Sequence, residues 1–167
     1  MKVLIISDNH GNEQLLKEIA DRHLSEVEAL FHCGDSELAA NSDAMKNYEG
    51  VRGNCDYDSD YPKELTRDVN GVLFYITHGH LHQVKSTLMP LKYRAEEVGA
   101  HVVCFGHSHI AGCEMVDGIL FINPGSILLP RMTKEQSYVI LECSEDDYSV
   151  LYYNEKGNIL KSLSYKK

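Results

Sequence analysis

The sequence predicts a single α/β domain, and three observations lead to this class. Apolar runs at residues 3–6 and 29–33 flank a segment with helical periodicity, which is the pattern of a βαβ unit. The carboxyl-terminal third consists of short β-rich runs separated by turns. The 167 residues can bury a substantial core, and no linker, repeat or low-complexity segment divides them. We therefore treat residues 1–167 as one domain.

The amino-terminal part is predicted to alternate strands with helices. Residues 2–7 are predicted to form a strand, because residues 3–6 are a continuous apolar run, typical of a strand that is covered on both faces. Asn12 is expected to cap the helix that follows. A second strand over residues 29–33 is expected to run parallel to the first. A short helix over residues 37–47 and a brief strand near Val51 come next in this prediction.

The middle of the chain contains two hairpin signals and one further βα pattern. Asn70-Gly71 joins the predicted strands 64–69 and 72–77. A helix over residues 86–98 has Pro90 in its first turn, where proline is tolerated. A buried strand over residues 102–105 follows this helix.

The carboxyl-terminal part is predicted to be β-structure. Asp117-Gly118 is expected to join the strands 112–116 and 119–122. The remaining predicted strands cover residues 137–143, 148–153 and 159–165.

Composition and charge exclude several classes of protein. A net charge of −9 argues against general binding to nucleic acid or to an anionic membrane surface. No apolar run approaches the roughly 20 residues that span a bilayer, and the apolar start is too short for a secretory signal. The five cysteines include no CxxC pair, so reduced thiols are expected. These features favour a cytoplasmic protein.

Side chains of the kinds that bind metals follow five of the predicted strands. The series consists of Asp8, His10, Asp35, Asn54, His78, His107 and His109. In extended backbone, residues two apart point the same way, so Asp8 with His10, and His107 with His109, are expected to lie side by side. Oxygen and imidazole ligands suit Mn, Fe, Co, Ni, Zn or Mg. The series therefore predicts a metal site at the strand ends.

These motifs resemble those of the calcineurin-like metallophosphoesterases. The resemblance is carried by the ordered blocks Asp8-x-His10, Gly34-Asp35, Gly53-Asn54-x-Asp56, His78-Gly79-His80 and Gly106-His107-x-His109. The variants Asn54-Cys55-Asp56 and Asn123-Pro124-Gly125-Ser126 are similar to those of the small bacterial and archaeal phosphodiesterase branch. The resemblance implies a four-layer αββα sandwich, in which two mixed β-sheets are flanked by helices.

The resemblance also implies a binuclear centre. Asp8, His10 and His109 would bind one divalent ion; Asn54, His78 and His107 would bind the other. Asp35 would bridge the two ions, for which we rank Mn first and then consider Ni, Co, Fe, Zn or Mg. A hydroxide shared by the ions would attack a small phosphodiester, and no covalent enzyme intermediate would form. The expected activity is a metal-dependent phosphodiesterase.

The expected catalytic set is Asp35, Asn54, Cys55 and His80. Many relatives have a histidine at the position of Cys55, thought to protonate the leaving oxygen. A thiol with a pKa near ~8.5 is a weak general acid for this purpose. His80, His82 or His32 could take that role, and Asn9 could contact phosphate or shape a turn.

Three alternatives to the phosphodiesterase are considered. A phosphomonoesterase uses the same centre. A scaffold subunit, like the retromer subunit that shares this fold, would retain the site for structure alone. The motif His78-x-His80-x-His82 suggests a metal hydrolase of another superfamily, which we rank last because no Asp-His pair follows it. The sequence leaves open whether copies of the chain form a homo-oligomer.

Overall fold

Two mixed β-sheets pack face to face in the computed structural model, which describes residues 1–167. One sheet has six strands in the order β11-β10-β9-β1-β2-β3, and the other has five in the order β4-β5-β6-β8-β7. The elements are β1 (Lys2–Ile6), α1 (Glu13–His23), β2 (Ala29–His32), β3 (Glu49–Gly50), β4 (Glu64–Val69), β5 (Val72–Thr77), the 3₁₀ helix η1 (His80–His82), α2 (Met89–Val98), β6 (Val102–Cys104), β7 (Gly112–Val116), β8 (Ile119–Asn123), β9 (Tyr138–Cys143), β10 (Asp147–Tyr153) and β11 (Ile159–Lys166).

Each sheet contains three adjacent parallel strands. In the first sheet, β1 pairs with β2, and β2 pairs with β3, in parallel. In the second sheet, β6 lies between β5 and β8 and is parallel to both. The remaining pairs are antiparallel. Because the parallel strands of a sheet run in the same direction, their carboxyl ends meet at one edge of that sheet. That edge holds the site described below.

Alternating side chains divide the core into three layers. Val3 and Ile5 of β1 pack between the sheets, where they share one cluster with Phe74 of β5. Leu4 lies on the opposite face of β1 and packs with Leu16 of α1. Because successive strand residues point to opposite faces, each central strand is covered on both sides.

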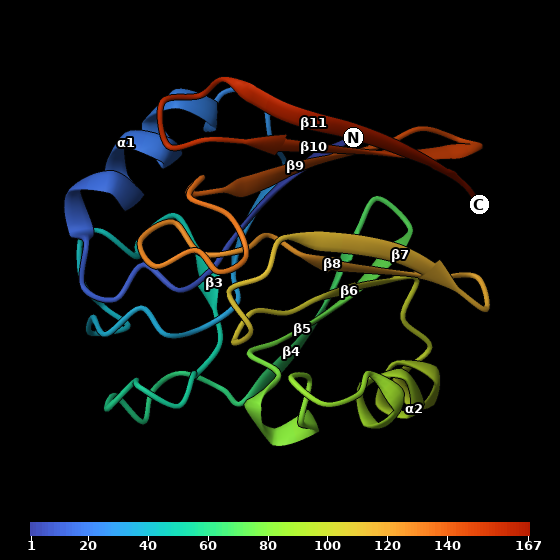
Figure 1. Ribbon diagram of the computed structural model, residues 1–167, viewed down its shortest axis with the longest axis horizontal. Coiled ribbons are helices and arrows are strands. Elements are labelled where there is room, and N and C mark those ends of the chain that lie inside the picture. The colour runs from blue at the N-terminus through green and yellow to red at the C-terminus, as the bar shows by residue number, and fades with distance from the viewer.

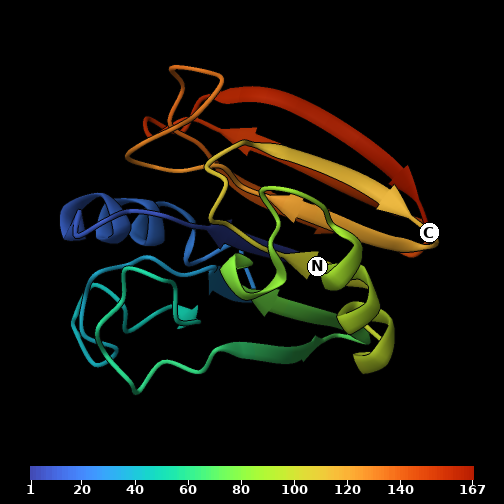
Figure 2. The same ribbon diagram turned by 60° about the horizontal axis from the view of Figure 1, so that its bottom comes forward.

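The helices cover the outer faces of the two sheets. The α2 helix packs Leu91 and Ala95 against Tyr75 and Val103 of the second sheet. The α1 helix covers the outer face of the first sheet in the same way, through residues such as Leu16. Figures 1 and 2 show the two helices on opposite sides of the molecule. The predicted four-layer arrangement is confirmed. No helix has the length and apolar character needed to cross a membrane.

Most predicted elements are present near their expected bounds. The side chain of Asn12 accepts a hydrogen bond from the amide of Leu15 at 3.2 Å, which confirms the predicted cap of α1. The α2 helix begins at Met89 instead of residue 86. Turns precede it, and Gln83 has a left-handed backbone with φ of 55°, so helical hydrogen bonding starts later than the apolar spacing suggests.

The helix predicted over residues 37–47 is wrong, because this segment forms successive turns. Glu37 has a φ of 55°, which is incompatible with a right-handed helix. The amide of Glu37 donates to the Asp56 carboxylate at 2.7 Å, and the amide of Ala40 donates to Asp58 at 2.8 Å. These remote carboxylates occupy the main-chain donors at the start of the segment, and a prediction based on local residues cannot include them.

Candidate metal centre

The structure brings the predicted ligand residues to the carboxyl ends of the central strands. Asp8 and His10 follow β1, Asp35 follows β2, and Asn54 comes after β3. His78 follows β5, and His107 and His109 come after β6. Both sheets therefore contribute, and their packing joins side chains that are up to a hundred residues apart in the sequence.

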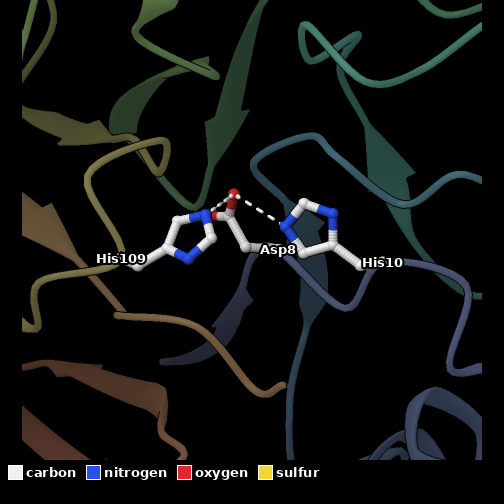
Figure 3. Close-up of side chains that lie close together, drawn as sticks. All are labelled: Asp8, His10 and His109. Atoms are coloured by element: carbon white, nitrogen blue, oxygen red, sulfur yellow. Dashed lines mark ion pairs between the residues drawn. The ribbon is translucent and has the colours of Figure 1, made fainter. Parts of the chain in front are cut away.

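The first group consists of Asp8, His10 and His109. Oδ1 of Asp8 lies 3.1 Å from Nε2 of His109 and 3.9 Å from Nε2 of His10. Figure 3 shows the carboxylate between the two imidazole rings. Oδ1 of Asp8 and Nε2 of His10 are buried and have no hydrogen-bond partner. A buried unsatisfied polar atom costs about 1–3 kcal/mol, which a cation at this position would remove. The donor atoms therefore fit a metal ion.

The second group consists of Asp35, Asn54, His78 and His107. Nε2 of His78 lies 3.3 Å from Oδ2 of Asp35 and 3.1 Å from Oδ1 of Asn54. The rings of His78 and His107 have centroids 5.0 Å apart. One ligand atom each from Asp8, Asp35 and His78 lie within 4.8 Å of one another. Asp35 therefore lies between the two groups, where a bridging ligand would be needed.

Three histidines are held by their Nδ1 atoms, which leaves Nε2 directed to the centre. Nδ1 of His78 donates to the carbonyl oxygen of Cys33 at 2.8 Å, and Nδ1 of His109 donates to that of Leu129 at 2.7 Å. Nδ1 of His10 lies 2.6 Å from the Glu37 carboxylate. Such contacts fix the tautomer and ring orientation that a metal ligand requires.

The backbone at the predicted ligands is left-handed at five positions. The φ values are 57° at Asp8, 41° at His10, 54° at Asp35, 66° at His107 and 60° at His109. Residues other than glycine adopt this region rarely, and they do so most often at functional sites. The extended backbone expected at residues 107–109 is therefore wrong. The ring of His107 lies beside those of His78 and His80, whereas that of His109 lies beside His10.

Two glycines permit the close approach of the ligand loops. A Cβ atom at Gly53 would lie 2.0 Å from Oδ1 of Asp35. At Gly106, a Cβ would lie 2.0 Å from Oγ of Ser7 and 2.6 Å from Oδ2 of Asp8. A side chain at either position would displace a carboxylate, so the Gly-x ligand motifs have a steric cause.

The charges in the centre keep the Asp35 carboxylate ionised. Burial opposes ionisation of Asp35, but contacts with His78 and with the amide of Cys55 lower its pKa well below the usual range. Burial also opposes protonation of His78, yet Asp35 and Asp8 raise its pKa. The adjacent Asp8 carboxylate raises the pKa of His109. These carboxylates would attract a divalent cation in the same way as they attract protons.

His107 is kept neutral by its surroundings. Burial, and then the charges of His78 and Lys85, lower the pKa of His107 to about 4. A neutral imidazole is the form that binds a metal ion. The nitrogen of His107 is therefore available for coordination at neutral pH.

Cys55 and His80 both lie close to the candidate ligands. The thiol of Cys55 accepts a hydrogen bond from Nδ2 of Asn54 at 3.2 Å. Burial and the nearby Asp35 raise the pKa of this thiol to about 11, so it is protonated at neutral pH. The His80 ring lies 5.3 Å from that of His78 and 6.1 Å from that of His107. Both residues are close enough to face a bound substrate.

The other candidates for proton donation occupy structural positions. His32 is fully buried, and its Nε2 bonds to Oδ1 of Asn9 at 2.8 Å while its Nδ1 accepts from Gly34. The contact with His32 gives Asn9, which is itself buried, a structural role. His82 bonds through Nε2 to the hydroxyl of Tyr75. His32 as the proton donor is therefore wrong, and His82 has a partner outside the centre.

Asp56 organises the loops that carry the second group. Its side chain is 4% exposed. It accepts hydrogen bonds from the amides of Asp35, Glu37 and Gly53 at 2.7–2.8 Å, and from Oγ of Ser36 at 3.1 Å. One carboxylate thus joins the loops after β2 and β3 and positions Asp35.

Four cations near the centre were not identified from the sequence. Arg52 and Lys63 line a small cavity with Asn54 and His80. Lys85 and Arg131 line a larger cavity that includes Ser108, the residue between His107 and His109. None belongs to a ligand motif, and only the fold brings their remote segments together.

Comparison with known proteins identifies the family of this chain. Residues 1–146 match the model of the calcineurin-like phosphoesterase superfamily domain. The "probable metallophosphoesterase YsnB" of Bacillus subtilis is 50% identical over 163 residues, which cover 98% of this chain and 96% of that protein. The phosphodiesterase MJ0936 of Methanocaldococcus jannaschii is 31% identical over 75% of this chain and 83% of its own. The chain belongs to the calcineurin-like phosphoesterase superfamily.

Solved structures show the same fold. A protein from Streptococcus pneumoniae, described as a predicted phosphoesterase, superposes with a TM-score of 0.96 at 31% identity and covers 99% of this chain and 97% of its own. Vps29 of Chaetomium thermophilum superposes with a TM-score of 0.80 at 17% identity, over 100% of this chain and 97% of that one. The second likeness concerns the fold alone.

Proposed function

We propose that this protein is a divalent-metal-dependent phosphodiesterase with a binuclear centre. The observation that carries the proposal is the position of Asp35 between two groups of donors, each of which could bind one cation. Asp8, His10 and His109 would hold the first ion. Asn54, His78 and His107 would hold the second, and Asp35 would contact both.

Two bound cations would activate a water molecule and stabilise the charge that develops on the phosphoryl oxygens. Only Asp8 and Asp35 among the ligands carry a negative charge, so two divalent ions would leave the centre at about +2. Such a centre attracts an anionic ester despite the net charge of −9 on the chain. The buried carboxylates and fixed imidazoles would position the cations before the substrate binds.

The chain offers His80 and Cys55 for the leaving oxygen. His80 lines the cavity beside Asn54, and burial lowers its pKa. Cys55 holds its proton at neutral pH because its pKa is raised to about 11. We assign leaving-group protonation to the protonated form of His80, since an imidazolium is a stronger acid than a thiol whose pKa is raised to about 11.

A diester is preferred over a monoester because two separate cavities border the loops that carry the candidate ligands. One is bordered by Asn54 and His80, and the other includes Ser108 beside His107 and His109. A diester has two substituents, and each cavity can accept one. The name of the archaeal relative, a phosphodiesterase, agrees with this preference.

The scaffold alternative is weakened by the state of the ligand set. All seven predicted ligands are present, and left-handed backbone is maintained at five of them. A scaffold subunit, which uses only the surface of the fold, would not require strained backbone at the ligand positions. The Vps29 likeness, at 17% identity, supports the shared fold and no more.

The first test is hydrolysis of bis(4-nitrophenyl) phosphate and 4-nitrophenyl phosphate by metal-stripped protein. Mn, Ni, Co, Zn or Mg is added back in separate runs, and the Asp35→Asn variant is assayed in parallel. We expect metal-dependent cleavage that favours the diester and is greatest with Mn. Absence of cleavage of both esters, with two ions bound, would contradict the proposal and favour the scaffold.

The cellular setting is part of the same proposal. All five cysteines are free, and three of them are buried. This is the expected state in a reducing compartment, so we place the enzyme in the cytoplasm.

A further inference from the structure

A cavity of about 580 Å³ opens beside the candidate metal centre and has no role in the centre itself. The segment before α2, the loop after β6 and the β7–β8 hairpin form its walls. Its apolar lining comes mainly from Val84, Leu88, Phe105, Ile110 and Phe121, which together we call the apolar groove. This size suits a ring-sized organic group.

Polar residues of the groove are joined to the loop that carries His107 and His109. Ser108 lies between His107 and His109, and its hydroxyl accepts a hydrogen bond from Nδ2 of Asn123 at 2.9 Å. The amide of Arg131 donates to the carbonyl oxygen of His109 at 3.0 Å. Ser108, Asn123 and Arg131 all line the cavity. The groove and the candidate ligands therefore share the loop after β6.

The charges on the lining match an anion bound at the mouth of the groove. Lys85 and Arg131 line it, both exposed, and Glu114 is the one carboxylate. A phosphoryl group at the centre could approach Lys85 or Arg131 while its organic substituent covered the apolar wall. Amphipathic ligands of this kind bind where apolar walls meet a few placed charges.

The cavity beside Asn54 differs in size and polarity. It measures about 280 Å³, and Leu81 is its one hydrophobic residue. Arg52, Lys63 and His80 line it, so it suits a small polar or anionic substituent. The two sides of the centre therefore distinguish the two arms of a diester.

We propose that the apolar groove binds an aromatic or similarly flat apolar substituent of the phosphodiester substrate, with the smaller polar arm on the Arg52–Lys63 side. This inference rests on the proposed phosphodiesterase function and defines its substrate class. Ile110, which is 40% exposed, is a specificity-determining residue in this arrangement. Lys85 contributes to the affinity for the phosphoryl group.

The test uses phenylphosphonate and methylphosphonate, which share a head group and differ in the organic arm. Their binding to the Mn-loaded protein is measured by calorimetry. We expect phenylphosphonate to bind at least about tenfold more tightly, because the ring buries several more carbon atoms. Ile110→Ser should reduce this preference by at least about threefold. Lys85→Gln should weaken both ligands by a similar factor, since the head group is common to them.

Ile159→Ser is the matched control, since Ile159 in β11 is 58% exposed and lies outside the groove. It should retain the full preference for the phenyl group. Equal binding of the two phosphonates to the unmodified protein, or the same loss of preference in both serine variants, would overturn the proposal. Thermal denaturation of each variant verifies that it is folded.

Calorimetry registers binding whether or not the protein hydrolyses an ester, so the two proposals fail separately. A phenyl preference sensitive to Ile110→Ser, without hydrolysis of any nitrophenyl ester, would support the groove and overturn the enzymatic function. Metal-dependent diester hydrolysis without a phenyl preference would support the function and overturn the groove.

Discussion

The main-chain amide of Cys55 donates a 2.7 Å hydrogen bond to Oδ1 of Asp35. This bond joins the loop after β3 to the carboxylate after β2, and it leaves Oδ2 of Asp35 at 3.3 Å from His78. The two oxygens of Asp35 thus have different roles, one structural and one directed to the candidate centre. The same contact helps to lower the pKa of this carboxylate.

Asp35→Asn is expected to abolish hydrolysis and to lower bound metal below two ions per chain. The amide can still accept from Cys55, but it loses the charge that would lie between the two ions. Metal content measured by mass spectrometry and nitrophenyl ester turnover provide the two readouts. Asp43→Asn, which removes an exposed carboxylate paired with Lys17, is the control. Full activity with two ions in the Asp35 variant would exclude the bridging role.

Gly53→Ala is expected to weaken metal binding by at least about tenfold, because the new methyl group would overlap Oδ1 of Asp35. Titration of the apo-protein with Mn measures the change. Gly112→Ala is a matched control for metal content and thermal stability, since a Cβ at Gly112 would contact nothing within 4 Å. Equal metal affinity in both variants would contradict the prediction. It would show that the loop after β3 can shift to make room for the methyl group without displacing Asp35.

Cys55→His is expected to raise turnover of alkyl esters more than that of nitrophenyl esters. An imidazole protonates a poor leaving group, whereas nitrophenolate leaves without a proton. The thiol of Cys55, with its pKa raised to about 11, gives little such assistance. The ratio of kcat values for the two ester classes is the readout. Equal gains for both classes would argue against protonation at this position.

His32 is expected to make folding pH-dependent. Burial lowers its pKa to about 4, from an ordinary value of 6.5 in the unfolded chain. The unfolded state therefore binds more protons between these values, so stability is full above pH 6.5 and falls as the pH drops toward 4. Between these pH values, the free energy of unfolding should change by up to about 1.4 kcal/mol per pH unit. Urea denaturation at several pH values measures it.

His32→Gln provides the comparison for that slope. The variant should be less stable at pH 7.5, because it loses the fitted contacts with Asn9 and Gly34. Its free energy of unfolding should change less with pH than that of the unmodified protein. Parallel curves for the two proteins would assign the pH dependence to other groups.

Much of the fold could be predicted from local pattern. The continuous apolar run of Val3, Leu4, Ile5 and Ile6 indicates a strand buried on both faces, and the structure places these residues in two different core layers. Local pattern also predicted a helix over residues 37–47, which the structure does not contain. Asp56 and Asp58, which hold its amides, lie in a loop about 20 residues further along the chain.

The candidate site was predictable in its members but not in its geometry. Extended spacing would place the rings of His107 and His109 together, yet left-handed backbone sends them to different partners. Neither the wall residue Ile110 nor the cation Lys85 belongs to a motif. Their contribution depends on how α2 and the β7–β8 hairpin pack around the loop after β6.

The sequence by itself determined the order of apolar strands and the ligand-type residues that follow them, because both are local properties of the chain. Only the tertiary structure decided which donors meet, since Asp8 and His109 are brought within 3.1 Å by the packing of two sheets. The packing of the segment before α2 and the β7–β8 hairpin around the loop after β6 created the groove. Contacts between residues far apart in the chain depend on the whole core, and no single segment encodes them.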